Sequence, residues 1–181
     1  MRSIDEIIAH LQRNMIAKPT LYEVYIFAPN AGNQDAPLDV TLNCSAVAVP
    51  GVNMSYTQDK RTGIGVVQNF PNTKSFNEVS LSFYESEKQN ERKYFVDWMN
   101  MIYDTNTKRF GFYRDYTRTI VIKQFDRSNN VVHEARLFDC FPANISPLDK
   151  SYSMTDTLPQ FSVSISFNEM QEIFYATNVG N

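Results

Sequence analysis

Few residues of this 181-residue chain combine the types and the spacing that metal binding or catalysis requires. The two histidines, His10 and His133, lack a cysteine or carboxylate partner at a metal-ligand spacing such as HExxH or CxxC, so we expect isolated surface side chains. No GxSxG sequence presents a serine nucleophile, and residues 63–65 (Gly-Ile-Gly) lack the third glycine of a phosphate-binding loop. These patterns favour turns and solvated positions over a catalytic site.

Two pairs of carboxylates lie close in the sequence, Glu85 with Glu87 and Asp149 with Asp156. A glycoside hydrolase needs two carboxyl groups that flank one bond, and sequence spacing does not indicate that either pair converges on a cleft. Solvated strand ends explain these carboxylates better, and a hydrolase is the weakest alternative. We therefore predict no enzyme activity, no metal and no cofactor.

One basic and aromatic run, residues 108–118 (KRFGFYRDYTR), has four cations and one carboxylate. Aromatic rings between cations can stack on bases while the cations neutralise phosphates, so a single-stranded nucleic-acid-binding module is one interpretation. The segment 109–112 is similar to the aromatic strand of an RNA-recognition motif, but the first glycine of that motif is missing. The other interpretation is a strand edge whose aromatics face the core and whose cations face solvent or a partner subunit.

The composition predicts a single compact domain. Acidic residues number 20 and basic residues 17, for a net charge of −3, which argues against a surface that grips nucleic acid or anionic lipid throughout. No stretch reaches the roughly 18–20 apolar residues that span a bilayer, and Asp5 and Glu6 disfavour a signal peptide. Cys44 and Cys140 lie in alternating apolar runs, so we expect buried thiols in a reducing compartment rather than a disulfide.

Two helices are expected. The first spans residues 3–15, with a Ser3–Glu6 capping box, and Pro19 follows it. The second spans about 87–103, with Ser86 as its cap, Glu91 on its solvated face and a buried face of large apolar side chains: Tyr94, Phe95, Trp98, Met101 and Ile102.

The remaining elements are expected to be strands. The segment 22–27 is rich in β-branched and aromatic residues. Period-two alternation of apolar and polar residues, which indicates one buried and one solvated face, marks the segments 40–46, 79–83 and 161–167. The segments 120–125 and 131–138 flank a turn-rich connector and predict a hairpin. Residues 51–76 are polar with little burial periodicity, so they predict a long loop, and loops of that length are often functional.

The order of these segments resembles the tail tube family of contractile bacteriophages, whose fold is shared with type VI secretion and pyocin tube proteins. The most telling block is 91–98, where Arg92, Phe95 and Trp98 stand at a spacing that recurs in the family. Another block carries a cysteine strand that runs into a Pro50-Gly51 corner. The matching blocks, which cover roughly residues 15–170, are 19–26, 44–51, 76–83, 91–98 and 137–145.

This resemblance implies a mainly β protein with one or two helices, a two-sheet β-sandwich or partial β-barrel of the tail tube type. It implies an N-terminal helix over 1–18 and one β domain over 19–181. It further implies homo-hexameric rings that stack into a tube in the virion tail, assembled in the host cytoplasm. Expected partners are sheath and baseplate proteins, and genomic DNA that passes through the lumen without sequence-specific binding; no membrane anchor is expected.

Subunit contacts are expected from the N-terminal helix, the 51–76 segment and the basic run, at Ile4, Ile8, Leu11, Arg61, Arg109 and Arg114. Within the family, the alternative is a baseplate tube-initiator or hub ring of the same fold. The nucleic-acid-binding module remains the alternative from another class.

Overall fold

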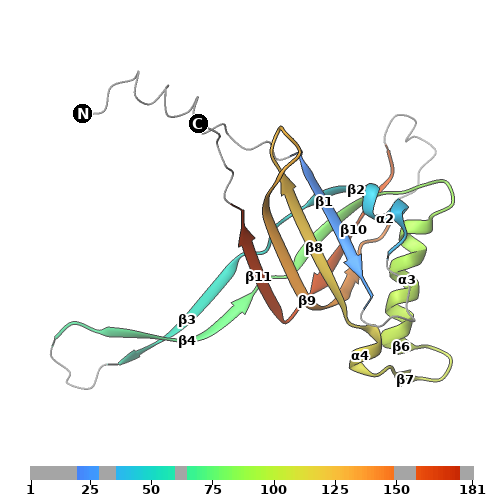
Figure 1. The fold of residues 1–181 in the computed structure, drawn as a ribbon. Helices are drawn as coiled ribbons and strands as arrows, with labels where there is room; N and C mark the ends of the chain where they lie inside the picture. The colour runs from blue at the N-terminus through green and yellow to red at the C-terminus, as the bar shows by residue number, and fades with distance from the viewer. Residues whose placement is uncertain (1–19, 29–35, 60–64, 149–157, 176–181) are drawn as a thin grey trace.

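A computed structural model describes residues 20–28, 36–59, 65–148 and 158–175. Two antiparallel sheets pack face to face (Figure 1). The first sheet has the order β1 (Tyr22–Phe27), β8 (Arg118–Phe125), β9 (Val131–Ile145), β11 (Glu169–Phe174). The second sheet has the order β9, β10 (Gln160–Ser166), β5 (Val79–Tyr84), β2 (Cys44–Val47). The predicted two-sheet, mainly β fold is confirmed, and the sheets are not closed within one chain.

Strand β9 belongs to both sheets. Its first part pairs with β8 and β11, and its last part pairs with β10. The change of sheet falls at Asp139, whose φ of 55° lies in the left-handed region that aspartate tolerates better than most residues. The predicted hairpin of β8 and β9 is also confirmed. Its turn is held by Asp126 Oδ1, which accepts hydrogen bonds from Ser128 N (2.7 Å) and Asn130 N (2.9 Å).

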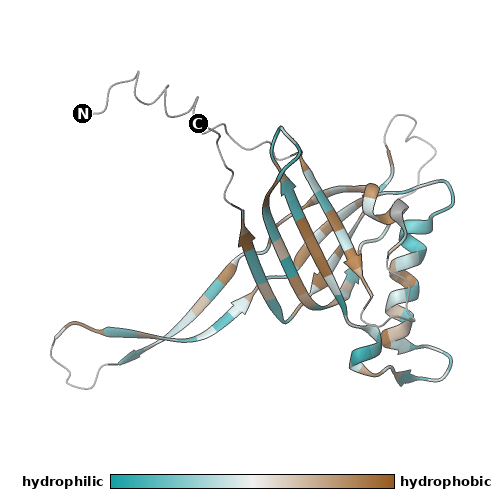
Figure 2. Cartoon of the chain, viewed as in Figure 1, coloured by the Kyte–Doolittle hydropathy of each residue, from teal (hydrophilic) through white to brown (hydrophobic). Residues whose placement is uncertain are grey.

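The core lies between the sheets and follows the predicted alternation. The inward side chains of β5 and β10 are at most 2% exposed: Val79, Leu81, Phe83, Phe161, Val163 and Ile165. Helix α3 (Asn90–Ile102) covers one end of the sandwich and adds Phe95 and Trp98 to this core. Figure 2 shows the resulting alternation of hydrophobic and hydrophilic residues along the strands. The prediction that Phe95 and Trp98 form the buried helix face is confirmed, whereas Met101 is 38% exposed.

The prediction of a single strand over 40–46 was wrong. Residues Leu38–Leu42 form the short helix α2, and only Cys44–Val47 form β2. The N–H groups of Val40 and Thr41 both donate to Pro37 O, which closes a helical turn instead of a ladder. Val40 is fully buried while Leu42 is 70% exposed, so the alternation in this segment does not reflect one strand face.

The start of α3 also differs from the prediction. The helix begins at Asn90, because Gln89 before it takes a left-handed conformation (φ 54°). Ser86 does not cap the helix; its N–H and Oγ donate to Glu91 Oε2 (3.1 and 2.8 Å), and Asn43 Nδ2 donates to Glu91 Oε1 (2.6 Å). Glu91 is therefore buried rather than solvated. Burial raises its pKa, but these hydrogen bonds outweigh that effect and hold the pKa below its usual value.

Residues 51–76 are not a loop. They form the strands β3 (Val52–Asp59) and β4 (Gln68–Phe76), which pair only with each other among the described residues and project from the sandwich as a ribbon (Figure 1). We call this hairpin the arm. Its register shifts beside Pro71, a residue that cannot donate to a ladder. Burial periodicity could not reveal these strands because nearly every residue in them is exposed.

Candidate assembly surfaces

The described residues contain no group of three or more His, Cys, Asp or Glu residues that could hold a metal ion. None of the described helices is long and apolar enough to span a membrane. His133 is not a surface side chain: it is 14% exposed, its Nε2 lies 3.5 Å from Glu172 Oε1, and its ring packs 4.7 Å from Phe174. His10 lies outside the described residues.

The two cysteines are free, with Cys140 buried and Cys44 partly buried. Burial raises the pKa of each thiol to about 12. Both thiols therefore stay protonated and unreactive near neutral pH. This chemistry indicates a packing role for both side chains.

The arm carries the first exposed apolar surface. Val52, Met54 and Tyr56 alternate along β3 and are 46%, 55% and 58% exposed, so they form one apolar stripe on a single face of the ribbon. The ribbon is anchored at its base, where the Phe76 ring packs 5.3 Å from Phe167. An isolated two-stranded hairpin is at best marginally stable in water, so the exposed stripe is a candidate contact surface.

The segment 103–117 forms a second exposed surface, which we call the tip. It consists of β6 (Tyr103–Asp104), β7 (Arg109–Phe110) and α4 (Tyr113–Tyr116). Phe110 and Phe112 are 77% and 82% exposed, so the expectation that the aromatics of this run face the core was wrong. Arg109 and Arg114 are exposed beside them. The tip therefore presents aromatic rings and cations together.

The tip is held firmly on the end of α3. Trp98 Nε1 donates to Tyr116 O at 2.6 Å. Gly111 N donates to Ile102 O at 3.0 Å, and a Cβ at Gly111 would lie only 2.4 Å from Met101 O, so only glycine fits this approach. The fourth cation of the run is not available to a partner. Arg118 is 7% exposed, packs over the rings of Tyr94 and Trp98 (5.3 and 4.9 Å), and donates to Tyr94 Oη at 2.9 Å.

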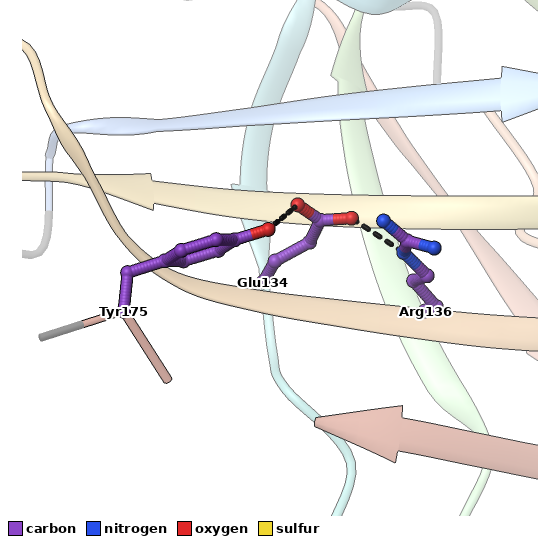
Figure 3. Close-up of polar contacts among 3 residues, drawn as sticks. All are labelled: Glu134, Arg136 and Tyr175. Atoms are coloured by element: carbon purple, nitrogen blue, oxygen red, sulfur yellow. Dashed lines mark hydrogen bonds and ion pairs between the residues drawn. The ribbon is translucent and has the colours of Figure 1, made fainter. Parts of the chain in front are cut away.

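The first sheet presents a third surface, the face turned away from the core. There Glu134 accepts hydrogen bonds from Arg136 Nε (2.6 Å) and from Tyr175 Oη (3.0 Å), as Figure 3 shows. Burial raises the pKa of Glu134, but Arg136 and Tyr175 outweigh it, and the pKa lies below its usual value. Sequence reasoning missed this cluster because Tyr175 is distant from Glu134 in the chain, and only the pairing of β11 with β9 brings them together.

The same sheet ends in two strands, β1 and β11, that pair on one side only within the described part of the chain. A backbone hydrogen bond from Ala36 N to Ile26 O (3.0 Å) covers one end of β1. An exposed strand edge is a template for pairing with another chain. The two edges therefore form complementary candidate surfaces on opposite sides of one sheet.

Comparison with known proteins decides the family. Residues 17–172 match the family model described as phage tail tube protein. The chain belongs to the phage tail tube protein family. It is a structural protein of the tail-tube type, and the resemblance drawn from the sequence is confirmed. No curated protein matches its sequence.

Solved structures share the fold at low sequence identity. A chain of the anti-feeding prophage (AFP) tube-terminating cap is 10% identical with a TM-score of 0.65, over 88% of this tail tube protein and 92% of that chain. A chain of the PVC sheath–tube complex, from an extracellular contractile injection system in the extended state, is 10% identical with a TM-score of 0.63, over 97% and 100%. A chain of the AFP baseplate is 10% identical with a TM-score of 0.63, over 90% and 99%.

Of the six residues predicted to make subunit contacts, the structure describes two. Arg109 and Arg114 lie on the tip and are exposed. Ile4, Ile8, Leu11 and Arg61 lie outside the described residues. The apolar stripe of the arm was not among the predicted residues, although the segment that contains it was.

Proposed function

We propose that this tail tube protein forms six-fold rings that stack into a tube around a channel. The observation that carries the proposal is the pair of edge strands, β1 and β11, which among the described residues pair on one side only and lie at the two ends of the first sheet. Pairing of β1 in one subunit with β11 in the next would join the sheets of a ring into one continuous barrel. Closure would remove the exposed edges, which otherwise invite uncontrolled association.

The covered side of the first sheet determines which face would line the channel. The second sheet and the core occupy one face, so six copies of these layers fit only on the outside of a closed ring. The opposite face, with Glu134 and Arg136, would then line the channel. Sheath proteins would contact the outer layers, and genomic DNA would pass along the inner face without sequence-specific binding.

The arm and the tip would supplement the strand contacts between subunits. They extend toward opposite sides of the sandwich in Figure 1, as a head-to-tail interface requires. In this arrangement the apolar stripe of one arm packs on the Phe110 and Phe112 rings of a neighbour, with Arg109 and Arg114 at the rim. We include in the same interface Ile4, Ile8 and Leu11 of a helix over residues 1–18, and Arg61, beside the single domain over 19–181.

A complementation experiment tests the head-to-tail contact. Tyr56→Asp would disable the arm and Phe112→Asp the tip, and neither variant should form rings in negative-stain micrographs. Mixed together, they retain one intact arm and one intact tip, so we expect two-subunit complexes by light scattering. Ser55→Asp, on the opposite face of the arm, is the matched control and should assemble. Rings from either single variant, or no complex in the mixture, would contradict the contact.

The ring could belong to the tube itself or to a baseplate initiator of the same fold. A tube subunit should polymerise into long tubes when it is concentrated alone, whereas an initiator should stop at one ring. Micrographs of the purified protein distinguish the two. We place the tube in the virion tail, assembled in the host cytoplasm.

The exposure of Phe110 and Phe112 also favours a second candidate, a single-strand-binding function of the tip. In that case, the protein should bind a short labelled oligonucleotide at low salt, and Arg109→Glu with Arg114→Glu should abolish the binding. If the unaltered protein does not bind, the tip is an assembly surface only.

A further inference from the structure

We infer that Glu134 keeps the cations of the channel face engaged, so that this face does not hold a nucleic-acid backbone. The inference rests on the proposed function, which turns this face toward the channel. It gives a role to Glu134, a buried carboxylate on the face of β9 that is turned away from the core. Glu134 acts by positioning and neutralising other side chains.

The environment of Glu134 is unusual for an outward-facing strand position. Its side chain is 7% exposed although the core lies on the other face of β9. Arg136, two residues along the same strand, and Tyr175, just beyond β11, contact its two oxygens from different sides (Figure 3). A buried carboxylate needs such partners, and here they keep it ionised. Arg136 Nε is in turn committed to the carboxylate.

Lys123, a second cation that strand register places on this face, lies between carboxylates on the two neighbouring strands. It lies directly opposite Glu134 on β9 and opposite Glu23 on β1. Its Nζ lies 5.1 Å from the centroid of the Tyr25 ring, and Tyr25 Oη donates to Glu23 Oε2. Carboxylates and cations therefore alternate across three strands: Glu23, Lys123, Glu134, then Arg136.

This alternation matters because phosphate contacts make binding to DNA strong. Each phosphate neutralised by a lysine or arginine releases counterions and increases the affinity. In a ring, one free arginine per subunit would be repeated around the channel, and again in every stacked ring. On this face Arg136 Nε is bound by Glu134, although the Arg136 side chain is 43% exposed, and Lys123 lies between two carboxylates. Such a face presents less free positive charge to a phosphate backbone than one without these carboxylates.

The test is Glu134→Gln, which removes the charge and keeps the shape. The probe is a fluorescein-labelled DNA duplex of mixed sequence, and the readout is fluorescence anisotropy with the purified full chain. We expect the variant to bind the duplex at least about tenfold more tightly than the unaltered protein at about 50 mM salt, with the gain lost by about 200 mM. Glu87→Gln makes the same charge change before α3, away from this face, and should show no gain.

A double variant tests whether the gain in DNA binding depends on Arg136. Glu134→Gln with Arg136→Gln removes the released cation and should return binding to the level of the unaltered protein. If Glu134→Gln does not fold, Glu23→Gln at the exposed carboxylate beside Lys123 provides the same test, with a gain expected for the same reason. A gain no larger than that of Glu87→Gln, or a gain that survives Arg136→Gln, would overturn the inference.

Micrographs of the same samples separate this inference from the proposed function. Rings without a gain in binding would overturn the role of Glu134 and leave the tube proposal standing. A gain without rings would support the electrostatic role of Glu134 on this face and contradict the tube.

Discussion

The sandwich and the arm are built from the same kind of strand, yet their apolar residues have different surroundings. On β5, Leu81 and Phe83 are at most 1% exposed, because β10 and α3 pack over them. On β3, Met54 and Tyr56 alternate in the same way and are more than half exposed. Period-two alternation thus identifies a strand with an apolar face, but it does not indicate whether the cover is supplied by the same chain.

The largest loss of stability should come from truncation of Trp98, in the sandwich. Trp98→Ala removes a side chain that is 1% exposed, its hydrogen bond to Tyr116 O and the surface on which Arg118 packs. We expect a loss of about 3–5 kcal/mol in the free energy of unfolding, measured by urea denaturation. A loss below about 1 kcal/mol, within the usual range for an exposed site, would show that α3 is not part of the core.

A second effect should appear at alkaline pH, again in the sandwich alone. Both thiols lie in its strands, and burial raises the pKa of each from 9.0 to about 12. The folded state therefore binds these protons more tightly than the unfolded state, and stability should decline as the pH rises from about 9 to about 12. The check is the urea midpoint across this range, compared with Cys44→Ala/Cys140→Ala, whose decline should be shallower. Equal slopes would exclude a contribution from the thiols.

The smallest effect on stability should come from the arm. Tyr56→Ala alters a side chain that is 58% exposed, so we expect a change within about 0.5 kcal/mol in the unassembled protein. The same substitution should weaken assembly, because it removes part of the stripe that a neighbour would cover. A large loss of stability in the monomer would mean that the arm packs on its own sandwich and that the contrast between the regions is false.

The sequence predicted the strands and the helix whose apolar faces are covered by other parts of the same chain. The strands around Leu81 and Val163 and the helix around Trp98 follow from periodicity because the chain itself covers one face of each. The arm was missed for the converse reason: its strands bury almost nothing among the described residues, and the apolar alternation at Val52, Met54 and Tyr56 is confined to part of β3.

Local chemistry explains the other differences. At 40–46 the turn that starts at Pro37 outweighs the alternation. Glu91 looks solvated by type, but Asn43 and Ser86, which hydrogen-bond to it, come from other segments of the chain. The Glu134 cluster likewise depends on the register between β9 and β11. A single sequence does not indicate which distant residues will contact a charged side chain.

The passage of β9 from one sheet to the other at Asp139 has a mechanical consequence. The same backbone is hydrogen-bonded in both layers, so the layers cannot slide past each other without breaking β9 or its ladders. A force applied to one sheet would be shared by both layers through this one continuous strand. Displacing β9 would remove strand pairing from both sheets, so we expect the sandwich to unfold cooperatively.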